Sequence, residues 1–270
     1  MTIEPHHRPA AGRRRLDQLL VDRGLVDSRT RAQALVRAGE VTVNGQREDK
    51  PGHQVPEDAD LVLRARPPYV GRGGSKLEGA LERFHLDVRG RICLDVGAST
   101  GGFTDCLLQR GAARVYAVDV GRAQLAWSLR QDPRVESLER QDIRNLPPLP
   151  QTPSLAVVDV SFISLRAVLP AVRRSVAPGS PVLALVKPQF EAGREQVGHG
   201  GVVRDSAVHQ AVLERLADWC IAEGWRILGA CPSPLTGGDG NREFFLLVAF
   251  GEAQAEDLGP AEVVAGCELA

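Results

Sequence analysis

Lysine is scarce in this chain of 270 residues, which contains three lysines and 30 arginines. Arginine can supply positive charge anywhere on a surface, whereas a lysine amine is compact and can exchange a proton when its surroundings favour that. The positions of the few lysines are therefore informative. Two of them, Lys76 and Lys187, lie at the ends of predicted elements of secondary structure.

Cysteine is also sparse, and its spacing is irregular. The five cysteines form no Cys-x-x-Cys pair, which is the spacing typical of zinc sites and of redox motifs. We therefore expect no metal site and no disulfide framework. Reduced thiols in a hydrophobic core are the simpler interpretation.

Long apolar runs are missing as well. No run approaches the roughly 18 apolar residues that a membrane-spanning helix needs, and the N-terminus carries His6, His7 and Arg8 in place of the apolar stretch of a signal peptide. We therefore expect a cytoplasmic protein. The absence of an amphipathic or apolar membrane segment also disfavours a membrane-lytic role.

Charge is distributed unevenly, although the net charge is only −1. Residues 1–76 carry 14 Lys and Arg against 10 Asp and Glu, whereas residues 77–270 carry 19 against 24. A basic front part joined to an acidic body suggests that the front part meets a polyanion. Chance variation on solvated surfaces explains the charge alone equally well.

The front part has the pattern of a small α+β domain. Residues 1–13 are expected to be a disordered lead. Two short helices follow, the second beginning at the N-cap residue Ser28, and the Asn44-Gly45 pair after a β-branched run is a strong hairpin signal. Residues 14–65 therefore read as two helices and a small sheet, and residues 66–75 as a linker stiffened by Pro67 and Pro68.

Strands and helices alternate in residues 76–250. This alternation predicts an α/β domain with a mostly parallel sheet that is covered on both faces. The last two strands are close in sequence and should form an antiparallel pair at one edge, and residues 251–270 are expected to be a loose tail. The expected strands are 91–96, 114–119, 135–139, 155–160, 181–187, 225–231 and 243–250, and the expected helices are 76–86, 102–111, 122–130, 165–176 and 205–223.

A Gly-rich turn follows the first strand of this α/β domain. Such a turn at the carboxyl end of a strand lets the backbone approach a nucleotide-like ligand, and the missing Gly-Lys-Ser/Thr disfavours nucleoside triphosphate hydrolysis. Asp119 ends the next strand, where an acid can bind ribose hydroxyls, and Asp142 follows the third strand, where it could accept a hydrogen bond from an adenine amino group. The candidate cofactor residues are Asp95, Gly97, Ala98, Ser99, Thr100, Gly101, Gly102, Phe103, Asp119 and Asp142. Each acid alone could be an ordinary loop residue, but together they favour a nucleoside cofactor.

Four charged residues stand where they could act on a substrate. Lys187 closes one apolar strand and Asp159 another, Glu243 opens the last strand, and Lys76 opens the first helix of the α/β domain. A lysine at the end of a buried strand can be partly desolvated, which helps an amine take part in proton transfer. Solvated ion pairs at strand ends are the alternative.

These four residues resemble the Lys-Asp-Lys-Glu tetrad of the FtsJ/RrmJ-like RNA 2′-O-methyltransferases, and residues 14–65 are similar to an S4 RNA-binding module. The combination resembles the TlyA family, ribosomal RNA cytidine 2′-O-methyltransferases that also carry the label hemolysin. The similarity covers about residues 14–250. Its motifs are Gly71–Leu77, Asp95–Phe103, Val158–Ser164, Val186–Glu191, Gly200–Asp205 and Gly240–Phe244.

The resemblance implies a Rossmann-like methyltransferase fold with S-adenosylmethionine as cofactor. It also implies Lys76, Asp159, Lys187 and Glu243 as catalytic residues, and ribosomal RNA or ribosomal subunits as partners. The front domain has few aromatic residues, so we expect it to contact phosphates and RNA shape, with binding that weakens as salt rises. The candidate RNA-binding residues are Arg13, Arg14, Arg15, Arg23, Arg29, Arg31 and Arg37.

Three alternatives remain open at this point. The chain could be a membrane-active hemolysin, or an RNA-binding protein whose methyltransferase domain is inactive. It could also methylate a protein or a small molecule. Enzymes that methylate base amino groups often carry an Asn/Asp-Pro-Pro-aromatic motif, and Asp159-Val160-Ser161-Phe162 lacks the proline pair, which favours a hydroxyl nucleophile. The sequence does not indicate the oligomeric state.

Overall fold

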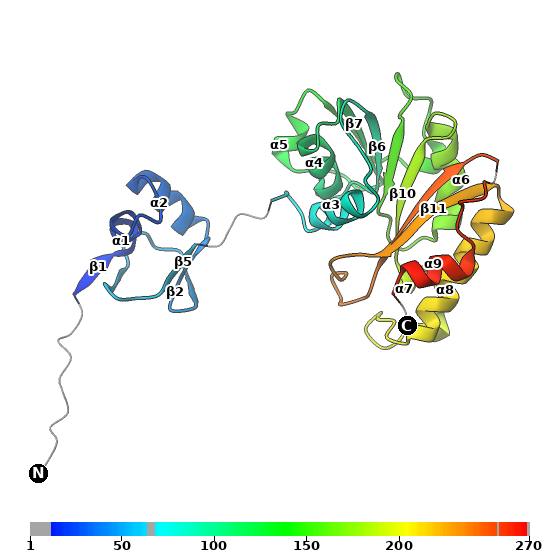
Figure 1. Cartoon of the computed structure of the whole chain (residues 1–270). Helices are drawn as coiled ribbons and strands as arrows, with labels where there is room; N and C mark the ends of the chain where they lie inside the picture. Colours follow the sequence, from blue (N-terminus) through cyan, green and yellow to red (C-terminus); the bar gives the residue numbers. More distant parts are fainter. Residues whose placement is uncertain (1–11, 64–67, 253, 269–270) are drawn as a thin grey trace, which may run out of the picture. The chain divides into compact units, whose positions relative to one another are not determined.

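The chain divides into two compact units, Met1–Pro67 and Pro68–Ala270, in a computed structural model that describes residues 12–63, 68–252 and 254–268 (Figure 1). The expected disordered lead falls mostly on residues 1–11, and the expected linker falls partly on residues 66–67, all of which lie outside the described residues. Each unit has a hydrophobic core of its own.

The first unit packs two helices against two small sheets. Its helices are α1 (Leu16–Asp22) and α2 (Arg29–Arg37), and its strands are β1 (Arg13–Arg15), β2 (Val41–Val43), β3 (Gln46–Glu48), β4 (Gln54–Pro56) and β5 (Leu61–Leu63). Ser28 caps α2 as predicted, and Asn44 and Gly45 both have positive φ in the turn between β2 and β3. The expected single sheet is instead divided, with strand order β3-β2-β5 in one part and β1-β4 in the other. Arg13, assigned to the lead, lies in β1 because it pairs with Pro56 of β4.

The second unit is built on a seven-stranded sheet. Its strands are β6 (Ile92–Val96), β7 (Arg114–Asp119), β8 (Val135–Glu139), β9 (Leu155–Val158), β10 (Pro181–Val186), β11 (Trp225–Pro232) and β12 (Phe244–Phe250), in the order β11-β12-β10-β9-β6-β7-β8. Strands β6 to β10 pair in parallel, whereas β12 is antiparallel to both of its neighbours. The carboxyl ends of the parallel strands therefore meet at one edge, where open α/β sheets bind their ligands.

Helices cover both faces of this sheet. The apolar cluster on one face includes residues of α3 (Gly73–Arg83), α4 (Gly102–Gln109) and α5 (Trp127–Arg130), and the cluster on the other includes residues of α6 (Leu165–Ser175), α8 (Ser206–Ala222) and α9 (Pro260–Gly266) (Figure 1). Neighbouring strand residues such as Cys93 and Leu94 enter opposite clusters, which is why the strands are apolar throughout. Three short elements complete the unit: η1 (Ile143–Asn145), α7 (Pro188–Glu191) and η2 (Arg194–Gln196).

Three expectations for this unit are wrong. Residues 73–75 of the expected linker belong to α3, which runs from Gly73 to Arg83 and not over 76–86. The tail is not loose, because α9 places Val263 and Cys267 in the core beside α8 and β11. Helix α5 begins at Trp127 and not near residue 122, because carboxylates bind the backbone before it. Asp119 accepts a hydrogen bond from the Gly121 N–H, and Glu139 accepts one from the Ala123 N–H.

None of the helices in the described parts of the chain is long and apolar enough to cross a membrane. The five cysteines are free thiols and all are buried.

Candidate active site

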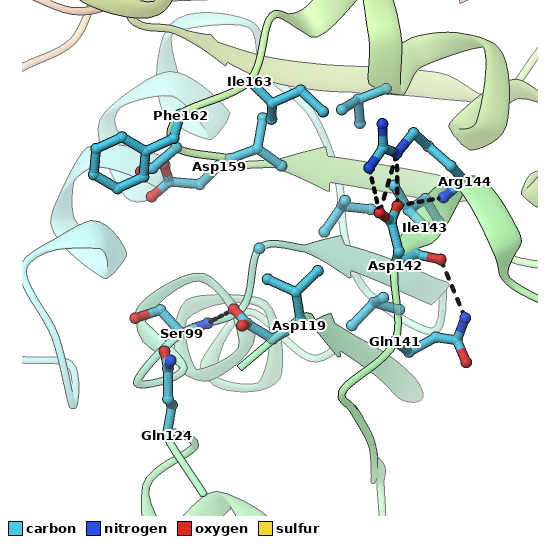
Figure 2. A pocket seen from close by; sticks show the side chains of 17 residues that line it. Ser99, Asp119, Gln124, Gln141, Asp142, Ile143, Arg144, Asp159, Phe162 and Ile163 are labelled. Atoms are coloured by element: carbon cyan, nitrogen blue, oxygen red, sulfur yellow. Dashed lines mark hydrogen bonds and ion pairs between the residues drawn. The ribbon is translucent and has the colours of Figure 1, made fainter. Parts of the chain in front are cut away.

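A cavity of about 490 Å³ opens at the carboxyl ends of β6, β7 and β9. This volume is within the range of small-molecule sites. Its wall combines apolar side chains with a few polar groups from separate strand ends. The lining residues are Val96, Gly97, Ser99, Val118, Asp119, Val120, Gln124, Gln141, Asp142, Ile143, Arg144, Asp159, Val160, Ser161, Phe162, Ile163 and Val168 (Figure 2).

The Gly-rich turn after β6 forms part of the cavity wall. A side chain at Gly97 would place its Cβ 2.3 Å from the carbonyl oxygen of Asp159, and Gly97 also has a φ of +86°. Gly101, with a φ of +97°, would place a Cβ 2.2 Å from Leu129. Both positions therefore require glycine. The predicted residues Ala98, Ser99, Thr100, Gly102 and Phe103, together with Gly73, Gly97 and Asp159, line an adjoining hollow of about 140 Å³.

Asp119 is fixed at the end of β7. Its carboxylate accepts one hydrogen bond from the Ser99 N–H at 2.8 Å (Figure 2). It accepts another from the Gly121 N–H at 2.7 Å. A carboxylate held in this way at a strand end has lone pairs left for ribose hydroxyls.

Asp142 lines the same cavity, but its carboxylate is already engaged. The guanidinium of Arg144 donates to both carboxylate oxygens, at distances of 2.6–3.0 Å, and the Arg144 N–H donates as well (Figure 2). These bonds hold the pKa of Asp142 below its usual range. Asp142 would therefore bind an adenine amino group only with its remaining acceptor capacity.

Asp95 lies beneath the Gly-rich turn and is completely buried. One carboxylate oxygen accepts a hydrogen bond from the Thr104 hydroxyl at 2.6 Å, and the other has no hydrogen-bond partner. Burial raises the pKa of Asp95 to about 7, and the nearby carboxylates of Asp159 and Asp119 add to this shift. An unpaired buried oxygen is costly in free energy. Asp95 lines neither the cavity nor the adjoining hollow, so it supports the Gly-rich turn from within the core and does not form part of the cavity wall.

Asp159 and Lys187 form an ion pair at the ends of adjacent strands. The Lys187 Nζ lies 2.6 Å from Asp159 Oδ1, and it donates a hydrogen bond to the Ser161 hydroxyl at 3.0 Å. Both charged side chains are mostly shielded from solvent.

Lys76 and Glu243 form a second ion pair, which is more deeply buried. Their Nζ and Oε2 atoms are 2.5 Å apart. The register of β10 and β12 ends with Val186 opposite Phe244, so Lys187 and Glu243 follow as the next opposed positions. The four residues predicted to be catalytic are thus brought to one edge of the sheet as two ion pairs.

Phe162 is part of this site, although the sequence analysis assigned it no role. Its side chain is 90% exposed, its φ is +63°, and its ring lies 5.0 Å from that of Phe190. A bulky residue with positive φ is uncommon and is often found at functional sites. Its position within the motif at 158–164 was the available signal, whereas its backbone conformation has no signature in the sequence.

Most of the arginines proposed to bind RNA have partners within the first unit. Arg15 and Arg29 both contact the buried carboxylate of Asp17. The other interactions join Arg13 to a backbone carbonyl, Arg14 to Asp22 and Glu57, Arg23 to the carbonyls of Glu57 and Ala59, and Arg31 to Asp27. Arg37 is exposed at the end of α2 and has no ion-pair partner among the described residues.

The family model of the FtsJ-like methyltransferases matches residues 69–250. The chain belongs to this family. The S4 domain model matches residues 14–61. The Gly-rich turn and the fixed carboxylate of Asp119 fit S-adenosylmethionine, the cofactor of the FtsJ-like methyltransferases, which carries ribose hydroxyls.

Three relatives extend over both units. YqxC of Bacillus subtilis, which is named as an rRNA methyltransferase, is 51% identical and the match covers 93% of this chain and 91% of YqxC. The 16S/23S rRNA (cytidine-2′-O)-methyltransferase TlyA of Mycobacterium tuberculosis is 48% identical, with 87% and 90% covered. A solved structure from Streptococcus thermophilus, described as a hemolysin, is 45% identical, covers 95% of this chain and 96% of its own, and has a TM-score of 0.71. This FtsJ-like methyltransferase is therefore of the TlyA type, with an S4 domain before the catalytic domain.

Proposed function

We propose that this protein methylates a ribose 2′-hydroxyl of a cytidine in ribosomal RNA. The observation that carries the proposal is the pair of ion pairs, Asp159–Lys187 and Lys76–Glu243, beside a cofactor-sized cavity. The names of the relatives from B. subtilis and M. tuberculosis support ribosomal RNA as the substrate. This substrate would place the protein in the cytoplasm.

The cofactor-holding residues of the proposal are those of the glycine turn and the strand ends. Gly97, Ser99 and Gly102 would receive the amino-acid end, Asp119 the ribose, and the wall that contains Asp142 and Ile143 the adenine. When bound, S-adenosylmethionine supplies a methyl group on a positively charged sulfur that leaves as a neutral thioether. Because this transfer neutralises charge, the protein needs orientation of the acceptor and removal of one proton more than it needs an oxyanion hole.

Lys187 is proposed to hold the acceptor hydroxyl in line with the methyl group. Asp159 and Ser161 fix the Lys187 amine, so its remaining N–H can point at the hydroxyl oxygen. The hydroxyl proton would pass to the carboxylate of Asp159, because a Lys187 ammonium that donates three hydrogen bonds has no lone pair to accept it. Lys76 and Glu243 complete the charge network and position the ribose. Orientation of this kind can supply up to about 7–11 kcal/mol of the barrier.

The first unit, which matches the S4 domain model and is called the S4 unit below, is proposed to deliver the RNA. Ion-paired arginines still carry charge toward a phosphate backbone, but Arg15 and Arg29 are partly committed to Asp17. Arg37 therefore becomes the foremost phosphate contact of the proposal, because no carboxylate of the described residues competes for it.

The test is transfer of labelled methyl from S-adenosylmethionine to purified ribosomal subunits, with the modified position mapped by mass spectrometry. We expect a 2′-O-methylcytidine in the wild type. We expect the Lys187→Ala variant to lose transfer while its affinity for S-adenosylmethionine changes little. Methylation of a base, or near wild-type turnover by Lys187→Ala, would refute the assignment.

A further inference from the structure

Glu191 joins the two chain segments that carry the Asp159–Lys187 ion pair. One segment follows β9 and begins at Asp159, and the other follows β10 and runs from Lys187 to Glu191. One carboxylate oxygen of Glu191 accepts a hydrogen bond from the Ser164 hydroxyl at 2.7 Å, and the other accepts one from the Leu165 N–H at 2.7 Å. The paired strands β9 and β10 have ended before this point. The bond from Leu165 therefore holds the backbone of the first segment to a side chain of the second.

The two bonds are made at the N-terminus of α6, where a carboxylate is well placed. Ser164 is the N-cap of α6, and its hydroxyl also accepts a hydrogen bond from the Arg166 N–H at 3.2 Å. The first N–H groups of a helix lack partners within the helix and favour a negative charge. Burial raises the pKa of Glu191, while its two hydrogen bonds and the positive charge of Arg166 oppose this shift.

Two further contacts join the same segments closer to the cavity. Lys187 donates to Ser161, and the rings of Phe162 and Phe190 are 5.0 Å apart. Of these groups, Ser161 and Phe162 line the cavity, whereas the bonds of Glu191 reach the start of a helix. We call the two hydrogen bonds of Glu191, to Ser164 and to Leu165, the Glu191 clamp. Of the contacts between the two segments, this clamp is the one that fixes their spacing.

We propose that Glu191 is a positioning residue for methyl transfer, whose clamp sets the geometry of the Asp159–Lys187 pair. This inference rests on the proposed function, because the pair acts on the acceptor hydroxyl there. Glu191 itself would touch neither the cofactor nor the RNA. A displacement of about 1 Å at a reacting group can cost on the order of 100-fold in rate.

Three variants separate positioning from general stability. Glu191→Ala removes both acceptors. Glu191→Gln keeps both contacts, because its carbonyl oxygen can accept from Leu165 and its amide can donate to the Ser164 hydroxyl. Asp257→Ala is the matched control, since Asp257 accepts hydrogen bonds from the Arg226 guanidinium and from the Gln254 N–H. Strand register places Arg226 opposite Ala249, and Ala249 opposite Pro181, at the end of the sheet away from Lys187.

We expect Glu191→Ala to lower kcat on ribosomal subunits by about 10- to 100-fold. Its KM for RNA and its affinity for S-adenosylmethionine should each stay within about 3-fold of wild type, because the change affects orientation and not ground-state binding. Glu191→Gln should retain most of kcat, and Asp257→Ala should retain it even where its melting temperature falls as far. A normal kcat in Glu191→Ala, or an equal loss in Glu191→Gln or Asp257→Ala, would overturn the proposal.

Amide hydrogen exchange tests the clamp without any methyl transfer. The Leu165 amide donates to Glu191, so it should exchange faster in Glu191→Ala and nearly as slowly as wild type in Glu191→Gln. Unchanged exchange in Glu191→Ala would contradict the clamp. If the wild type itself transfers no methyl to RNA, the proposed function fails, and the exchange rates still decide whether Glu191 fixes the segment.

Discussion

Asp17 is the buried charge on which the S4 unit depends, and its removal is our most demanding prediction. Its side chain has no exposed surface. The carboxylate accepts two hydrogen bonds from Arg15 at 3.0 Å, one from Arg29 at 3.0 Å and one from Gln33 at 2.9 Å. These partners, Arg15 first, hold the pKa of Asp17 far below its usual range.

The expected loss in the Asp17→Ala variant is large for so small a unit. Breaking a buried ion pair by removing one partner typically costs about 3–5 kcal/mol. A unit of some 50 residues, at about 0.05–0.15 kcal/mol per residue, has a free energy of unfolding of only about 2.5–7.5 kcal/mol. Asp17→Ala should therefore remove at least about 40% of the free energy of unfolding of the S4 unit, a loss of about 3–5 kcal/mol, while the catalytic unit, which has its own core, keeps its stability.

Hydrogen exchange measured by mass spectrometry can follow both units in the full chain. Peptides from residues 14–61 should lose protection in Asp17→Ala, peptides from the sheet of the catalytic unit should not, and RNA affinity should fall while cofactor affinity persists. Asp22→Ala is the control, because Asp22 pairs with Arg14 at an exposed site where such pairs contribute about 0–1 kcal/mol. Protection of residues 14–61 equal to that of the control would refute the reasoning.

Two further predictions concern charge. The stability of the Asp95→Asn variant relative to the wild type should increase by up to about 4 kcal/mol as pH rises from about 4 to 7. The pKa of Asp95 is raised to about 7 in the folded protein, so folding favours the protonated acid and ionisation destabilises the native state. Urea unfolding across this pH range measures the difference in free energy of unfolding between the two proteins, and a difference that shrinks as pH rises would contradict the prediction. Arg37→Ala should weaken RNA binding and reduce the steepness of log affinity against log salt concentration by about one. Filter binding at several salt concentrations measures this slope, and an unchanged slope would exclude Arg37 as a phosphate contact.

The sheet of the catalytic unit was predictable because its strands are apolar runs closed by turn residues. The expected strand 181–187 differs from Pro181–Val186 by one residue, and 114–119 matches β7. The position of the site followed from the same pattern, since charged residues that end parallel strands must meet at one edge. The opposition of Lys187 and Glu243 did not follow, because it depends on the pairing of β10 with β12.

Other features depend on tertiary contacts that no local pattern reports. The segment before α5 has helical composition, but the carboxylates of Asp119 and Glu139 bind its backbone in place of helical hydrogen bonds. Helix α9 is short and is stabilised by burial of Val263 and Cys267 against α8 and β11. In the S4 unit, a count of arginines predicted a basic surface but not that Asp17 engages two of them.

Phe162 shows that backbone conformation is the feature of the cavity wall least visible in sequence. A positive φ at a bulky residue costs on the order of 1–3 kcal/mol and persists only where the surroundings over-determine the conformation. Here the surroundings come from residues 187–191, which follow β10. The ring of Phe190 lies against that of Phe162, and Glu191 binds Ser164 and Leu165, which follow Phe162 in the chain. The local preference of Phe162 is therefore overruled by contacts between residues almost 30 positions apart, so the motif identifies the place but not the shape of the site.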